Sequence, residues 1–202
     1  MRVSRAQAEK NRENVITVAS QLFRKHGFDG VGLKDLMKGA GLTQGAFYKQ
    51  FASKEDLAAQ ASERAFEEAA KRWADSVAEN PEDPLGAMLG LYLSTGHRDE
   101  ITEGCPIVAL GADASRQSNE VKAPFEAGIR GLIESLGQLI GESGDQRVTG
   151  NAMAVLSTMT GAVILSRAVN DKKLSEQILQ AAAESIRPSA TAGDDPDSGS
   201  RA

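Results

Sequence analysis

Few residues in this chain could carry out covalent chemistry. Its 202 residues include one cysteine, Cys105, and two histidines, His26 and His97. A nucleophile pair of Cys105 and His97 would need a third group to orient the imidazole, and nothing in the sequence supplies one. Metal-ligand spacing and a phosphate-binding glycine loop are also missing. We therefore expect no catalytic residue, no metal site and no cofactor, and we do not expect an enzyme.

Binding chemistry is indicated instead by a short polar run: Thr43, Gln44, Gly45, Tyr48 and Lys49. Thr43, together with the free amide groups at the start of a helix, can bind a phosphate, because that end carries partial positive charge. Gln44 can form hydrogen bonds with a base edge in the major groove of DNA. Gly45 removes side-chain bulk, so that a helix could approach the DNA closely.

Further residues extend this candidate DNA-binding surface. Lys49 and Lys54 can neutralise phosphates, Tyr48 can donate a hydrogen bond to one, and Lys34 in the preceding segment joins the candidates. Ordinary surface exposure would explain the same residues. The polar pattern alone does not decide between the two interpretations.

Three apolar patterns must position these side chains. The first has the spacing of one helix face and ends near Gly27; it consists of Val15, Val18, Ala19, Leu22 and Phe23. A second short helix is predicted over residues 33–40, and Thr43 is predicted to cap a third, with Ala46 and Phe47 facing inward. Two short helices joined by a tight glycine-containing turn are the helix-turn-helix pattern.

The segment AGLTQGAFYKQFASKEDL, residues 40–57, resembles the signature of TetR-family transcriptional regulators. The residues that match this signature are Ala40, Gly41, Gly45, Tyr48, Phe51, Ser53, Lys54, Glu55 and Leu57, with close substitutes at Leu42, Thr43 and Phe47. The resemblance covers about residues 12–57. One departure is Gly32, where family members often begin the second helix with Thr or Ser. Gly32 offers no hydroxyl, so one side-chain phosphate contact is not expected there.

Charge divides the chain at the end of the same segment. The formal net charge of −5 is the sum of +6 up to Lys54 and −11 beyond it. Such asymmetry favours a polyanion-binding part attached to a part with another task. Chance clustering of solvated Lys and Arg is the alternative explanation.

The rest of the chain is also predicted to be helical. Aromatic residues make up only 4% of the composition, which argues against a β-sandwich or barrel. Helices are predicted over residues 53–79, 85–96, 107–115, 120–141, 146–169 and 173–187, with a loop over 96–106 and Pro188 as a stop. The predicted fold is all-α, with a helix-turn-helix DNA-binding domain over 1–53, a helical regulatory and dimerisation domain over 54–187, and a disordered tail over 188–202.

The last two predicted helices are unusually apolar, which fits burial on both sides. The resemblance implies that they form a four-helix dimer interface, and its candidate residues are Val155, Met159, Val163, Leu174, Ile178 and Ala182. Core packing within one subunit would explain the same pattern. A dimer would present two recognition helices about 34–36 Å apart to a palindromic site.

By the same resemblance, a small-molecule effector should bind inside the second part of the chain. The candidate ligand-binding residues are Trp73, Tyr92, His97, Cys105, Phe125, Ile129 and Met159. Each of them could equally be core. An aliphatic and aromatic lining with few charges would favour an apolar or aromatic molecule.

Cys105 invites a second interpretation. It lies at a predicted loop-to-helix junction, where the helix N-terminus favours a thiolate, so it could sense oxidants or electrophiles. The Gly-Cys-Pro segment also resembles one TetR subgroup, in which this cysteine is often only buried packing.

These patterns together predict a ligand-responsive, dimeric DNA-binding regulator, by family resemblance a repressor. No run reaches the roughly 18 apolar residues of a membrane span, and the N-terminus lacks an apolar leader core, so we expect a cytoplasmic protein without a membrane partner. The alternatives are a thiol sensor acting through Cys105 and a non-enzymatic helical interaction protein.

Overall fold

The computed structural model describes residues 4–141 and 146–191, and every regular element within these ranges is helical. The all-α class predicted from the sequence is therefore confirmed. The chain divides into two compact units, unit 1 with residues 1–71 and 100–129 and unit 2 with residues 72–99 and 130–202. The domain boundary expected at residues 53–54 is a functional division and stays a prediction.

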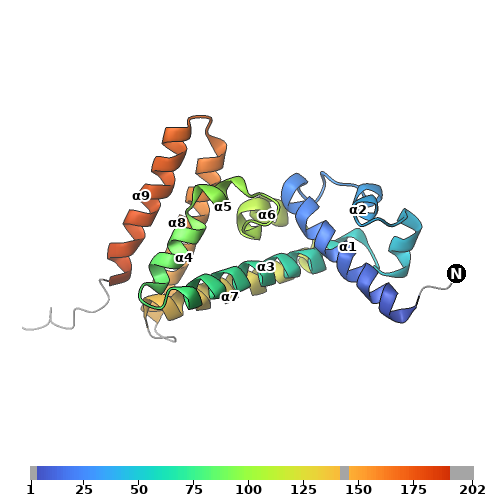
Figure 1. The fold of residues 1–202 in the computed structure, drawn as a ribbon, viewed down its shortest axis with the longest axis horizontal. Helices are drawn as coiled ribbons and strands as arrows, with labels where there is room; N and C mark the ends of the chain where they lie inside the picture. Colours follow the sequence, from blue (N-terminus) through green and yellow to red (C-terminus); the bar gives the residue numbers. More distant parts are fainter. Residues whose placement is uncertain (1–3, 142–145, 192–202) are drawn as a thin grey trace, which may run out of the picture. The chain divides into compact units, whose positions relative to one another are not determined.

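Unit 1 contains the helix-turn-helix (Figure 1). Its elements are α1 (Arg5–His26), α2 (Leu33–Gly39), the 3-10 helix η1 (Gln44–Lys49), the first part of α3 (Lys54–Glu79), α6 (Pro106–Ala114) and the first part of α7 (Asn119–Ile140). Helix α1 begins where the Ser4 hydroxyl accepts a hydrogen bond from the Gln7 amide, and it ends at Gly27, which has a φ of 77°. The third element forms 3-10 rather than α-helical turns over its six residues.

The apolar side of each predicted helix in this part of the chain points inward. Side chains that are at most 1% exposed include Val15, Ala19, Phe23, Leu36, Met37, Phe47 and Leu57. Burial of an apolar side chain of this size contributes about 1.5–3 kcal/mol. Helices as short as α2 and η1 are not stable alone in water, so this packing holds them in place.

Two hydrogen bonds of Asp56 cap the start of helix α3. The Asp56 amide donates to the Ser53 hydroxyl at 3.0 Å, and the Asp56 carboxylate accepts from the Ala52 amide at 2.9 Å. This arrangement satisfies donors that the start of a helix leaves without partners. The cap predicted at Ser53 is thus present.

Aromatic rings attach α7 to the rest of unit 1. Phe125 contacts Phe28 at 6.3 Å and Phe66 at 5.2 Å between ring centroids, both edge to face. A Cβ at Gly128 would lie 2.2 Å from the Phe66 ring, so the absence of a side chain there permits the close approach of α3 and α7.

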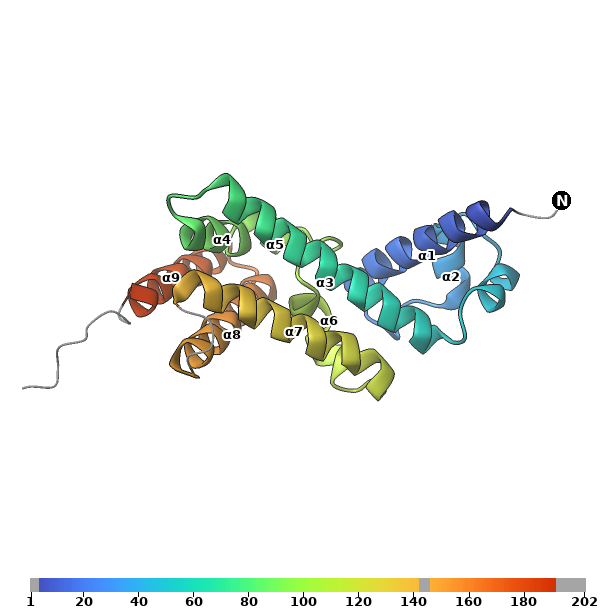
Figure 2. The ribbon, with the colours of Figure 1, turned by 90° about the horizontal axis from the view of Figure 1, so that it is seen from below.

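Unit 2 is built from the remaining helices. They are the second part of α3, α4 (Pro84–Tyr92), α5 (Thr95–Asp99), the second part of α7, α8 (Gln146–Ala168) and α9 (Lys172–Thr191). Helices α8 and α9 lie side by side in both views of the ribbon (Figures 1 and 2).

Two predicted helix boundaries are wrong. Helix α4 ends at Tyr92, and α5 begins within four residues of it because the Ser94 hydroxyl donates to the Leu91 carbonyl and accepts from the His97 amide. Helix α9 continues past Pro188 to Thr191, since a proline near the end of a helix costs a hydrogen bond but keeps a helical φ. The rest of the predicted tail, 192–202, lies outside the described residues.

Helix α8 is long and apolar enough to cross a membrane by length and composition, with a mean hydropathy of 1.5 in its most apolar window. The core helix of a soluble protein meets the same criteria. Only 33% of that window is buried inside the structure, so much of its apolar surface faces outward.

Candidate functional site

Helix η1 divides its side chains as the sequence predicted. Phe47 is fully buried, whereas Gln44, Gly45 and Lys49 are exposed and Tyr48 is 67% exposed. Gly41, with a φ of 71°, makes the tight turn before η1, where the Leu42 amide donates to the Met37 carbonyl at 2.8 Å. The burial of one side therefore presents the polar side to solvent.

Thr43 precedes η1 but does not act as the side-chain cap that the sequence predicted. The Ala46 amide, which such a cap would satisfy, instead donates to the Thr43 carbonyl at 2.9 Å in the tighter 3-10 turn. The exposed Thr43 hydroxyl is therefore not engaged by its own helix and can bind a phosphate oxygen.

Nothing in the fold requires glycine at position 45. No atom lies within 4 Å of the position that a Cβ would take, and the backbone does not adopt a left-handed conformation there. The missing side chain consequently leaves open space on the outer face of η1, where a DNA groove would lie.

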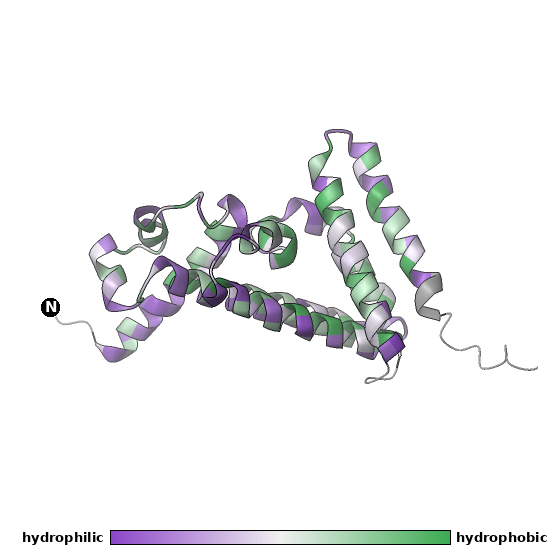
Figure 3. Ribbon diagram, turned by 180° about the vertical axis from the view of Figure 1, so that it is seen from behind, coloured by the Kyte–Doolittle hydropathy of each residue, from purple (hydrophilic) through white to green (hydrophobic). Residues whose placement is uncertain are grey.

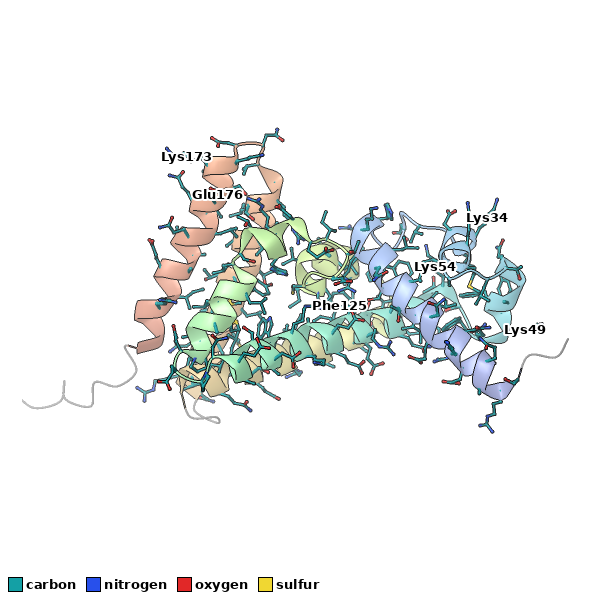
Figure 4. The ribbon with its side chains drawn as sticks, viewed as in Figure 1. Lys34, Lys49, Lys54, Phe125, Lys173 and Glu176 are labelled. Atoms are coloured by element: carbon teal, nitrogen blue, oxygen red, sulfur yellow. The ribbon has the colours of Figure 1, made fainter. Side chains whose placement is uncertain are left out.

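Three lysines of the candidate DNA-binding surface, Lys34, Lys49 and Lys54, lie in unit 1 (Figure 4). Lys34 and Lys49 are exposed and Lys54 is half-buried, and within residues 4–141 and 146–191 none of them forms an ion pair. By contrast, Arg64 is paired with Glu13, and Arg24 with Glu68. Arg24 therefore counts toward the +6 of residues 1–54 although its side chain is buried and paired, which residue counting could not reveal.

The candidate ligand-binding residues do not gather in one unit. Cys105, Phe125 and Ile129 belong to unit 1, whereas Trp73, Tyr92, His97 and Met159 belong to unit 2. Cys105 directly precedes α6, so it lies at a loop-to-helix junction as predicted. Its side chain is 3% exposed. Their role in ligand binding stays a prediction.

Within unit 2, three of these candidates pack against one another. The Tyr92 ring lies edge to face with Trp73 at 5.7 Å and 4.6 Å from the His97 ring, and His97 Nδ1 is 2.7 Å from the Tyr92 carbonyl. Burial lowers the pKa of His97 below its ordinary value of 6.5, and the charges of Arg167 and Arg72 act in the same direction.

A hollow of about 220 Å³ occurs elsewhere in unit 2 and has a mainly apolar lining. Its lining residues are Ile140, Asn151, Ala154, Val155, Thr158, Ser185 and Ile186, from α7, α8 and α9. None of the seven ligand candidates lines it, although Val155 was proposed for the dimer interface.

The candidate dimer residues lie at different depths. Val155, Met159, Val163 and Ala182 are buried within the subunit, whereas Ile178 is half-buried and Leu174 is 44% exposed. Three apolar residues of α8 are exposed instead: Met153, Ile164 and Leu165, at 45–58%. Figure 3 shows that hydrophobic residues occur along the whole of this helix. Apolar residues surround α8, so the sequence could not tell which of its faces packs within the chain.

Comparison with known proteins relates this geometry to one family. Residues 15–61 match the family described as bacterial regulatory proteins, tetR family. The HTH-type transcriptional repressor NemR of Escherichia coli (strain K12) is 28% identical over 132 residues, which span 64% of this chain and 66% of that protein. The match thus covers just under two thirds of that relative's length.

Solved structures with a similar fold cover most of the chain. The reduced form of Escherichia coli NemR has a TM-score of 0.74 at 24% identity and covers 89% of this chain and 96% of its own. A TetR transcriptional regulator from Chloroflexus aurantiacus has a TM-score of 0.75 at 26% identity and covers 90% and 96%.

Replacing Gly45 by alanine tests whether the glycine is needed for folding or for DNA binding. Because the site has space and ordinary backbone angles, we expect Gly45→Ala to keep or raise the free energy of unfolding, by up to about 1 kcal/mol. The added methyl should weaken binding to double-stranded DNA at least about tenfold, measured by fluorescence anisotropy. Gly131→Ala, another site with no atom within 4 Å of the added Cβ, is the matched control and should leave DNA binding unchanged.

The lowered pKa of His97 predicts a dependence of stability on pH. The unfolded chain takes up this proton more readily than the folded one, so the contribution is complete above about pH 6.5 and is lost as the pH falls below it. Urea unfolding at about pH 7.5 and pH 5.5 should show this loss, and His97→Asn should reduce it. An equal pH dependence in His97→Asn and the parent would contradict the assignment.

Proposed function

We propose that this chain, whose residues 15–61 match the tetR family of bacterial regulatory proteins, is a dimeric transcriptional repressor that a small molecule releases from a palindromic DNA operator. The observation that carries the proposal is the outer face of η1. One exposed surface there carries the Thr43 hydroxyl, which does not cap η1, the Gln44 amide, and Lys49, which forms no ion pair within the described residues. It also carries Gly45, a glycine that the fold does not require.

In this proposal η1 enters the major groove. Gln44 reads a base edge, and Gly45 permits the close approach. Thr43, Tyr48 and Lys49 bind the phosphate backbone, with Lys34 and Lys54 adding charge at its margins. Phosphate contacts fix the register of the protein and base contacts select the sequence, so no chemical step is required.

A second copy of the chain is the proposed occupant of the outward side of α8. The exposed side chains of Met153, Ile164 and Leu165 form an apolar surface there, which soluble monomers rarely leave uncovered. Gly161 supports close helix approach at the same side, because nothing lies within 4 Å of its would-be Cβ. Burial of this surface between two subunits also explains why α8 resembles a membrane span in composition.

Release by an effector follows from two conformations of the dimer. A molecule that binds better to the state with wrongly spaced recognition helices shifts the population away from DNA, by no more than its difference in affinity for the two states. The proposed effector is apolar or aromatic, and it binds the helical part that follows the DNA-binding segment.

The alternative thiol sensor stays a prediction. Cys105 is only 3% exposed, so an oxidant would reach its sulfur through a local opening of the segment before α6. A scaffold without DNA binding is the less economical alternative, since it leaves the exposed face of η1 without a role. Membrane binding is not proposed, because a second subunit accounts for the apolar side of α8.

The proposal predicts that lysines at different places contribute unequally to DNA binding. Lys49→Ala should weaken binding and reduce the slope of log K against log salt by about 1, because one phosphate contact is lost. Lys173→Ala removes the same charge from the start of α9 and should leave the slope unchanged (Figure 4). Fluorescence anisotropy over a salt series, with a duplex selected from a randomised library, measures both. Equal slopes in Lys49→Ala and the parent would contradict the proposed contact.

The proposed subunit interface gives a separate prediction. Leu165→Glu places a charge on the outward side of α8 without burying it in the subunit, since Leu165 is 58% exposed. We expect monomers in sedimentation velocity. Operator binding should be strongly weakened, because the DNA-binding segment of one subunit alone makes half the contacts. Ile101→Glu, at a 43% exposed site in unit 1, is the control and should remain a dimer. A dimer that survives Leu165→Glu would show that the interface lies elsewhere.

A further inference from the structure

Of the charged residues that the structure describes, Arg24 alone is buried. Its side chain is 0% exposed, although it lies in the last turn of α1 beside the exposed Lys25 and His26. A charged side chain is almost never fully buried unless it is paired, and burial of a charge is costly even then. The position of Arg24 therefore needs a specific explanation.

The Arg24 guanidinium joins three segments of unit 1. It donates to the Ser20 carbonyl and hydroxyl in α1, to a Glu68 carboxylate oxygen in α3 at 3.1 Å, and to the Gly104 carbonyl at 3.1 Å. The planar fork of arginine can serve these diverging acceptors at once, whereas the single ammonium of lysine cannot. This geometry fits a residue that fixes the positions of α1, α3 and the segment before α6 relative to one another.

The Gly104 carbonyl is a particular acceptor, because it comes just before the start of α6. Gly104, Cys105 and Pro106 are all buried, and Cys105 is the residue that precedes the first turn of α6. The preceding turn is closed by Glu100, whose carboxylate accepts from the Thr102 hydroxyl and amide. Arg24 therefore connects the end of α1 to an ordered segment that leads into α6.

The other end of α6 also lies close to the same helix. A Cβ at Gly27, the residue that ends α1, would lie 2.5 Å from the Asp113 carboxylate in the last turn of α6. The end of α1 thus meets α6 at both ends, through Arg24 at one and through Gly27 at the other. Helix α1 in turn packs against α2, which precedes η1 and contacts it.

We propose that Arg24 is a positioning residue for DNA binding, which couples the conformation of residues 100–106 to the orientation of the recognition surface. This inference rests on the proposed function. A change that moves the Gly104 carbonyl away from Arg24 leaves the buried guanidinium with one acceptor fewer, and the end of α1 shifts to recover a partner. Arg24 itself touches no DNA, because its side chain is buried.

Conservative exchanges at adjacent positions test this role. Arg24→Lys keeps the charge near Glu68 but loses the fork, so we expect DNA affinity to fall about tenfold, within the usual range of coupling between sites. The salt slope should stay that of the parent, because no phosphate contact is removed. Lys25→Arg, the matched exchange at the exposed neighbour, should bind like the parent. Parental affinity in a folded Arg24→Lys, or a slope reduced by about 1, would overturn the role.

Hydrogen exchange in the unmodified protein tests the coupling without any variant. Coupling is reciprocal, so binding the duplex selected from a randomised library should slow amide exchange in residues 100–110 by about fivefold or more, along with that in residues 40–57. Protection of residues 40–57 alone would overturn the role of Arg24 while leaving the proposed function intact. Failure to select any duplex would overturn the proposed function, and this role with it.

Discussion

Burial of Phe47 is the constraint on which the recognition surface depends. Helix η1 has only six residues and cannot hold its own conformation, so its orientation is set by the one large side chain that it buries. Leu36 and Met37 from α2 are fully buried in the same unit. Once Phe47 faces inward, the other side of η1 must face solvent. The polar groups of Thr43, Gln44 and Lys49 are therefore accessible there.

Electrostatics divides the cations of unit 1 into two groups with different tasks. Lysines at the margins of the recognition surface keep their charge in water, where it is available to phosphates at little desolvation cost. Arg24 is instead buried, where its planar fork satisfies several acceptors at once. Arg64 pairs with Glu13 and Arg24 with Glu68, so both stabilise helix contacts. The basic residues of unit 1 are therefore divided between lysines of the candidate DNA-binding surface and arginines in ion pairs within the protein.

The sequence was most informative where local rules dominate. Three features follow from propensities within a few residues: the apolar spacing of α1, the glycine turn at Gly41 and the hydrogen bond from the Asp56 amide to the Ser53 hydroxyl. It was least informative in α8, where apolar residues surround the helix and periodicity cannot assign a face. The break between α4 and α5 also escaped prediction, because it depends on hydrogen bonds of a single hydroxyl, that of Ser94.

The sequence by itself determined the helical class, the helix-turn-helix and the side of η1 that faces outward, since these depend on short-range patterns of polar and apolar residues. Only the tertiary structure decided which cations are exposed, which apolar residues of α8 lack cover, and how the candidate ligand residues divide between the two units. Those properties depend on partners far apart in the chain, such as Arg24 and Gly104, which are 80 residues apart. No local pattern encodes such a contact, because its energy exists only after the helices have packed.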